Sequence, residues 1–160
     1  MGGLIKRIIV AISGSESSIN GAKYAIMLAK DYKWDLSVVY VIDTSTIKEL
    51  LLSKIFIEEE SNDYEASLES NGNRYLDFVE GLAKSKGLKI NKLLKRGAVS
   101  TMILEAAEDE KADMIVLGAW ELNRSKNDLV NRHHMDILRD SKFSVLIVKE
   151  EEIENLFKRF

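Results

Sequence analysis

The chain alternates between short, nearly continuous apolar runs and longer stretches in which apolar residues recur every three or four positions. The short runs are rich in β-branched residues, which is typical of strands that are buried on both faces. We expect five such strands, at about residues 4–12, 36–42, 89–95, 114–117 and 145–148. Because a helical pattern separates each strand from the next, the strands are predicted to be parallel and joined by right-handed crossovers.

The helical spacing is clearest over about 18–32 and 62–86. A further helix is expected to start at Ser100 or Thr101, either of which could cap it, and another to cover about 128–140. The segment 43–61 is predicted to form a short helix or a folded excursion. These elements predict an α/β fold, an open five-stranded parallel sheet with helices on both faces. We expect its strand order to be 3-2-1-4-5.

The last residues extend beyond this alternating pattern. We predict one domain over residues 1–149 and an amphipathic tail helix over 150–160. The tail's apolar residues repeat at helical spacing: Ile153, Leu156, Phe157 and Phe160. Such a stripe must be covered, either by this chain's own domain or by a partner.

Composition excludes several classes of function. The chain of 160 residues has a net charge of −3, so electrostatics give no case for nucleic acid or an anionic membrane as partner. No apolar stretch approaches the ~20 residues of a membrane span. There is no cysteine, which excludes disulfides, thiolate metal sites and cysteine nucleophiles. We expect a cytoplasmic protein.

Two loops are candidate binding sites. Ser13 to Ser18 connect a buried strand to a helix through small hydroxyl residues, and a helix N-terminus offers free N–H groups to an anion. With order 3-2-1-4-5, the strand order reverses between the first and fourth strands, where such sheets bind ligands. The loop 118–127 would then lie beside the first loop.

Several segments together resemble the universal stress protein family. They are Ile8 to Ser18, Val39 to Asp43, Gly97, Glu105 to Gly118, and Val145 to Lys149. The resemblance covers about residues 4–149 in order. It implies a Rossmann-like fold of the adenine nucleotide alpha hydrolase type and a cytoplasmic stress-associated protein. It also implies a homodimer through the fifth strand. The amphipathic tail, which lies outside the resemblance, is a second candidate surface. Some members of the family bind ATP and others do not.

The chain keeps the first glycine of the pattern of the ATP-binding members, Gly118, and departs from the rest of that pattern. Those members have a glycine three positions later and another ten further on, followed by Ser or Thr. This chain has Glu121 and Asn131 at the glycine positions and Arg132 at the hydroxyl position. Ser13 replaces the usual acidic residue after the first strand. A carboxylate ~4 Å from a phosphate charge costs about 4 kcal/mol in a partly screened cleft, so the pattern disfavours ATP.

The resemblance also identifies candidate site residues. Around an adenosine it implies five of them: Ala11, Ile12, Ser13, Val41 and Gly118. Arg132 would serve the phosphates, or belong to a solvated basic loop. Trp120 would stack on a base or close the empty pocket.

Other chemistry finds less support in the residues. The first loop resembles that of PP-loop ATP-using enzymes, but Ser15 and Ser17 replace the family's Gly and Asp. His133 and His134 point about 100° apart on a helix, so they cannot share one metal ion, and we expect surface or interface residues near the cleft. We predict no metal site and no catalytic set. The sequence favours a homodimeric regulatory module with a degraded nucleotide site, and an ATP- or AMP-binding protein is the alternative.

Overall fold

The computed structural model describes residues 3–119 and 129–160, and side chains in the second range from 133 onward. A five-stranded parallel sheet has the order β3-β2-β1-β4-β5, as predicted. Its strands are β1 (Arg7–Ile12), β2 (Asp35–Asp43), β3 (Asn91–Gly97), β4 (Met114–Gly118) and β5 (Ser144–Val148). The helices are α1 (Glu16–Tyr32), α2 (Thr44–Leu52), α3 (Glu58–Ser85), α4 (Val99–Asp109), α5 (Leu129–Asp140) and α6 (Ile153–Arg159).

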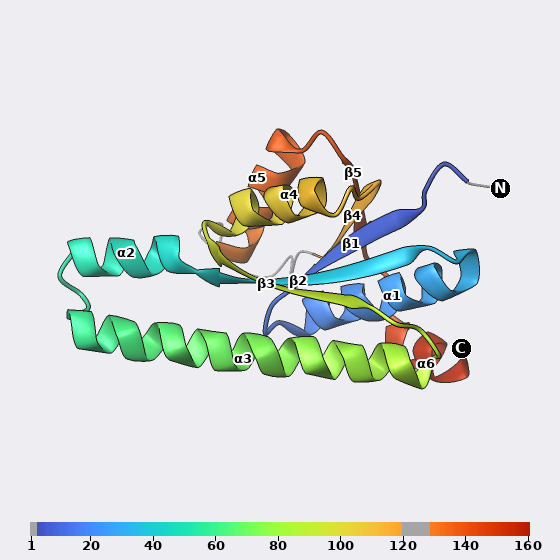
Figure 1. Cartoon of the computed structure of the whole chain (residues 1–160), viewed down its shortest axis with the longest axis horizontal. Coiled ribbons are helices and arrows are strands. Elements are labelled where there is room, and N and C mark those ends of the chain that lie inside the picture. Colours follow the sequence, from blue (N-terminus) through green and yellow to red (C-terminus); the bar gives the residue numbers. More distant parts are fainter. Residues whose placement is uncertain (1–2, 120–128) are drawn as a thin grey trace.

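The helices form one layer on each face of the sheet (Figure 1). α1, α3 and α6 cover one face, and α4 and α5 cover the other. The alternation of β1 shows how the sequence builds both layers, since Ile8, Val10 and Ile12 belong to the first core and Ile9 to the second. This period of two explains why the strands read as continuous apolar runs.

Several predicted boundaries were wrong by a few residues, each for a local reason. β1 begins at Arg7 and not at Leu4, which is exposed. α1 begins at Glu16 because the Ser15 hydroxyl accepts from the amide of Ser18 and caps the helix. α4 begins at Val99 with Ala98 as its cap residue, so neither Ser100 nor Thr101 is the cap.

The segment after β2 forms a helical hairpin. α2 is the predicted short helix, and Asp43 caps it by accepting from the amide of Thr46 at 3.0 Å. α3 begins at Glu58, earlier than expected, so three glutamates occupy its first turn, where the helix dipole favours negative charge. α2 and the start of α3 project beyond the strands (Figure 1).

The carboxyl-terminal helix α6 lies against α1 (Figure 1). Ile153 and Phe157 are buried in the same core cluster as Ala22 and Ile26 of α1. Of the two ways to cover the tail's apolar stripe, these residues show docking on its own domain.

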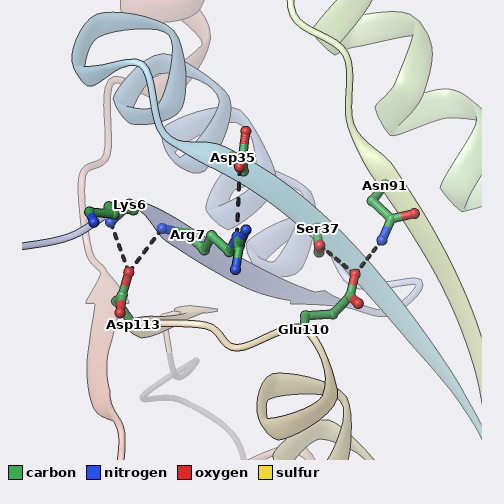
Figure 2. Close-up of polar contacts among 7 residues, drawn as sticks. All are labelled: Lys6, Arg7, Asp35, Ser37, Asn91, Glu110 and Asp113. Carbon is green, nitrogen blue, oxygen red and sulfur yellow. Dashed lines mark hydrogen bonds and ion pairs between the residues drawn. The ribbon is translucent and has the colours of Figure 1, made fainter. Parts of the chain in front are cut away.

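At the amino ends of the strands, Asp113 joins β1 to β4 (Figure 2). Its Oδ2 accepts from the backbone amides of Lys6 at 2.8 Å and Arg7 at 3.0 Å. These two hydrogen bonds hold the pKa of Asp113 below its ordinary value. Asp113 lies within the stretch that resembles the family, and the geometry gives it a structural role.

Candidate functional site

The candidate site lies at the carboxyl ends of β1 and β4, where the strand order reverses. A hollow of about 90 Å³ lies there, between the loop after β1, the end of β4, α4 and α5. Its described lining is apolar, hydroxyl-bearing or histidine: Ala11, Ile12, Ser13, Ser15, Ser17, Ser18, Val99, Ile103, Leu117, Gly118, His133, His134 and Ile137. Pockets that hold small molecules usually measure about 300–1,000 Å³, so this hollow is small.

The serine loop satisfies much of its own hydrogen bonding. The amide of Ser13 donates to the Ser18 hydroxyl at 2.9 Å, and that hydroxyl lies 2.9 Å from the carbonyl oxygens of Ser13 and Ser15, to which it can donate. The amide of Ser18 donates to the Ser15 hydroxyl at 3.2 Å, and that of Ile19 to the Ser15 carbonyl at 3.3 Å. The amide of Ser18, in the first turn of α1, is therefore already bonded within the loop and is not available to an anion.

Gly118 allows α1 to pack directly against the end of β4. A Cβ at this position would lie 2.2 Å from the carbonyl oxygen of Ser17, closer than atoms can approach. A Cβ on Gly21 of α1 would lie 3.1 Å from the amide nitrogen of Gly118. The two glycines therefore meet where the helix crosses the strand. The packing of the fold alone requires a glycine at 118.

The two adjacent histidines connect α5 to two different strand ends. His134 Nε2 donates to the carbonyl oxygen of Gly118 at 2.9 Å. His133 Nε2 lies 4.0 Å from Asp43 Oδ2, at the end of β2. Both histidines lie at the cleft, near which they were expected, and their rings are partly buried in the lining of the hollow.

The sequence analysis missed the role of these histidines, although a signal was present. Ile137, which is buried, lies three residues after His134, so both lie on the inward face of α5. Helical spacing from this apolar residue would have placed His134 toward the strands. The divergence of the two rings was expected, and the structure directs them to Gly118 and Asp43.

The surroundings of the hollow are acidic. No described residue that lines it is a lysine, arginine, aspartate or glutamate. A second hollow of about 190 Å³ adjoins it at His133 and carries three carboxylates, Asp43, Glu49 and Asp136. Among the described side chains, this neighbourhood offers an incoming phosphate repulsion and no cation.

The predicted site residues are distributed as follows. Ala11, Ile12, Ser13 and Gly118 line the hollow together. Val41 is partly buried against the apolar cluster beneath α4 and is not in the lining. Trp120 lies outside the described residues. Arg132 belongs to α5, but its side chain lies outside the described part of the structure.

A larger hollow, of about 550 Å³, lies at the opposite end of the sheet. Five of its polar side chains pair with one another (Figure 2). Glu110 accepts from Ser37 Oγ at 2.9 Å and from Asn91 Nδ2, and Arg7 lies 3.7 Å from Asp35. Since ligands of such sheets bind at the carboxyl ends of the strands, we assign this hollow no part in the candidate site.

Neither a metal-binding cluster nor a membrane-spanning helix occurs among the described residues. No group of three or more His, Asp or Glu side chains is placed there to hold a metal ion. No helix among residues 3–119 and 129–160 combines the length and apolarity that a bilayer crossing requires.

Comparisons with known proteins agree with this architecture. A universal stress protein of Methanocaldococcus jannaschii is 28% identical over 158 residues, covering 94% of this chain and 86% of that protein. A solved universal stress protein of Burkholderia pseudomallei matches with a TM-score of 0.73 at 21% identity, covering 94% of this chain and all of the other. A solved universal stress protein in complex with cAMP matches with a TM-score of 0.68 at 23% identity, over 91% and 98% of the two chains.

The model of the universal stress protein family matches residues 4–149, nearly the whole chain. These are the residues over which the sequence resembles the family and which form the sheet and its two helical layers. The chain belongs to the universal stress protein family.

Proposed function

We propose that this chain is a regulatory binding module whose nucleotide cleft has lost the ability to hold ATP. The observation that carries the proposal is the hollow of about 90 Å³ at the carboxyl ends of β1 and β4, lined by hydroxyls, apolar groups and two histidines. A triphosphate needs room, donors and positive charge. The described residues leave little room, and the amide of Ser18 is already bonded to the Ser15 hydroxyl. Asp43 and Asp136 add negative charge in the adjoining hollow.

The sequence adds the positions where the family's ATP-binding pattern fails. Glu121 and Asn131 replace two glycines, and Arg132 replaces a hydroxyl residue. At ~4 Å, a carboxylate and a phosphate charge repel by about 4 kcal/mol at an effective dielectric constant of about 20, which weakens binding about a thousandfold. Arg132 could offset part of this repulsion.

A second candidate function is binding of a smaller adenine nucleotide. A solved relative was determined in complex with cAMP, which places a nucleotide in at least one protein of this fold. In this chain Ala11, Ile12 and Ser13 would face the adenosine, with Val41 and Gly118 beside them. Binding of a smaller nucleotide needs the hollow to widen, because the His134 ring is hydrogen-bonded to Gly118 at the end of β4.

A thermal-shift assay separates the two candidates. The purified chain is heated with ATP, AMP or cAMP, each with and without Mg²⁺. A ligand at 100 times its Kd stabilises the folded state by about 2.7 kcal/mol, which is easily seen as a rise in Tm. Our proposal predicts no rise with ATP. A rise with AMP or cAMP alone would establish the second candidate, and a rise with ATP would refute the first.

Homodimerisation through β5 is part of the proposal. The two edges of the sheet differ, because β3 carries Lys92, Lys95 and Arg96, whereas β5 has no charged residue. Charged edge strands resist pairing, and apolar ones favour it. The tail contributes less to this interface, because Ile153 and Phe157 are buried on their own domain.

The dimer has a direct test, since the chain has no cysteine of its own. A spin label on Lys149→Cys, just after β5, should report a short distance between two copies, and sedimentation at low protein concentration should give twice the chain mass. A label on Asp77→Cys of α3, far from β5, serves as the control. A monomeric mass would refute the interface.

We also place the protein in the cytoplasm, as its resemblance to the family implies. Fractionation of cells that carry a tagged copy tests this placement. Recovery of the protein from the cytoplasmic fraction is expected, and recovery only outside the cytoplasm would contradict it.

A further inference from the structure

The hairpin formed by α2 and α3 presents an apolar tip to solvent. Leu52, Ile55 and Ile57 are 73%, 65% and 60% exposed, and Tyr64 is partly exposed beside them. They lie within 13 residues, in the part of the molecule that projects beyond the sheet (Figure 1). Contiguous apolar exposure of this kind marks an interaction surface more often than single exposed residues do. We call these four residues the tip.

The tip is bordered by negative charge. Glu58, Glu59 and Glu60 follow Ile57 directly and are exposed, and Asp63 lies one turn further along α3. Counting residues 48–63, five carboxylates face two lysines, Lys48 and Lys54. The matching surface on a partner should therefore be apolar at its centre and basic at its border. An anionic membrane is a poor match.

This chain carries such a surface at its other end. A hollow of about 460 Å³ is lined by Gly3, Leu4, Ile5, Lys6, Tyr32, Lys33 and Trp34. Tyr32 and Trp34 stack with their rings 5.0 Å apart, and the lining holds two lysines and no acidic residue. Asp31 and Asp35 are close in sequence, and Asp35 pairs with Arg7. We call this surface the aromatic hollow.

We propose that the tip of one copy docks into the aromatic hollow of a second copy. The aromatic hollow lies where α1 ends and β2 begins, and the tip lies at the far end of the long axis (Figure 1). A contact between two different patches at opposite ends does not close on itself, so it extends copies into linear chains. The contact uses neither the cleft nor β5, so it stands independently of the proposed function.

The test combines concentration-dependent mass with complementation. Ile55→Glu disables the tip, and Leu4→Glu disables the aromatic hollow. Both side chains are largely exposed, so the Tm should be unchanged. We expect the wild-type mass, by sedimentation, to rise with concentration, and each variant to weaken this growth about tenfold. Phe78→Glu, an equally drastic change on an exposed residue of α3, should leave the growth intact.

The mixture of the two variants decides the geometry. Ile55→Glu retains its aromatic hollow and Leu4→Glu retains its tip, so the mixture should form species heavier than either variant alone. Added salt should weaken these species, since the two borders carry opposite charges. A wild-type mass that is independent of concentration up to about 1 mM would overturn the proposal. So would a mixture no heavier than its components, which would indicate tip-to-tip pairing or a different partner.

Discussion

At the scale of single residues, Gly118 shows that a family motif can have a packing reason. The sequence pattern suggests a bare backbone for an approaching phosphate, whereas the structure fills that space with the backbone of Ser17 and Ser18. A substitution here therefore tests folding before it tests binding. Ser13→Asp adds a carboxylate in the loop after β1 and places no new atom between Gly118 and Ser17, so it does not disturb this packing.

A pair of glycine substitutions tests this interpretation. Gly118→Ala should destabilise the fold by about 3 kcal/mol or more, because its Cβ would overlap the Ser17 carbonyl. Gly81→Ala, in the interior of α3, should stabilise the fold by about 0.5–1 kcal/mol, because beyond the helix's own backbone the added Cβ would meet no atom within 4 Å. Urea unfolding measures both. Equal effects of the two substitutions would show that the crossing of α1 and β4 is not tight.

Asp113 provides a second prediction at this scale. Asp113→Ala should cost about 1 kcal/mol, since its exposed carboxylate loses two hydrogen bonds to backbone amides. Asp35→Ala, which breaks only an exposed ion pair, should cost less than about 0.5 kcal/mol.

The contribution of Asp113 should depend on pH in a definite direction. Its pKa in the folded chain is lowered, so its contribution is present above the unfolded pKa of about 3.9 and is lost as the pH falls through the folded pKa. The stability difference between wild type and Asp113→Ala, measured by unfolding from pH 7 down to pH 3, should therefore shrink below about pH 4. A difference that grows on acidification would reverse the assignment.

At the scale of elements, the tail helix is a component of the core. α6 lies on α1, and Ile153 and Phe157 complete the same apolar cluster as Val148 of β5. The amphipathic pattern predicted the helix, but periodicity alone could not decide between this domain and a partner. That choice depends on the groove that α1 leaves open, which is a tertiary feature.

Ile153→Ala should destabilise the chain by about 2–4 kcal/mol, because it leaves a cavity at a buried site. Phe160→Ala, at a position 41% exposed, should cost less than about 1 kcal/mol. Chemical denaturation compares the two. A small effect at Ile153 would indicate that α6 is only loosely attached to α1.

At the scale of the whole molecule, the parallel sheet could be predicted from the sequence, because buried parallel strands leave continuous apolar runs. The expected strand order is confirmed, but apolar runs alone do not determine it. The interior of the cleft could not be predicted to the same extent. Ala11, Ile12, Ser13 and Gly118 were expected there and do line it. The hydrogen bonds of Ser18, and the positions of His133 and His134, depend on how α1 and α5 approach the sheet. The spacing of residues in the sequence does not show how these two helices pack against the sheet.

The same limit applies to the ends of the molecule. The tip lies around the connection between α2 and α3, and the aromatic hollow combines residues 3–6 with residues 32–34, so neither forms a motif in the sequence. Leu4 was expected to belong to the first strand, and the structure instead leaves it exposed at the aromatic hollow. The departure from the predicted strand coincides with the surface that we propose to be an interface.

The most direct test of the central claim is a calorimetric titration of Mg·ATP into two forms of the protein. One is the wild type, and the other is the triple variant Glu121→Gly, Asn131→Gly and Arg132→Ser, which restores the family's ATP-binding pattern. We predict no binding heat for the wild type at about 1 mM ATP and a measurable Kd for the triple variant. Saturable binding by the wild type, equal to that of the triple variant, would contradict the account.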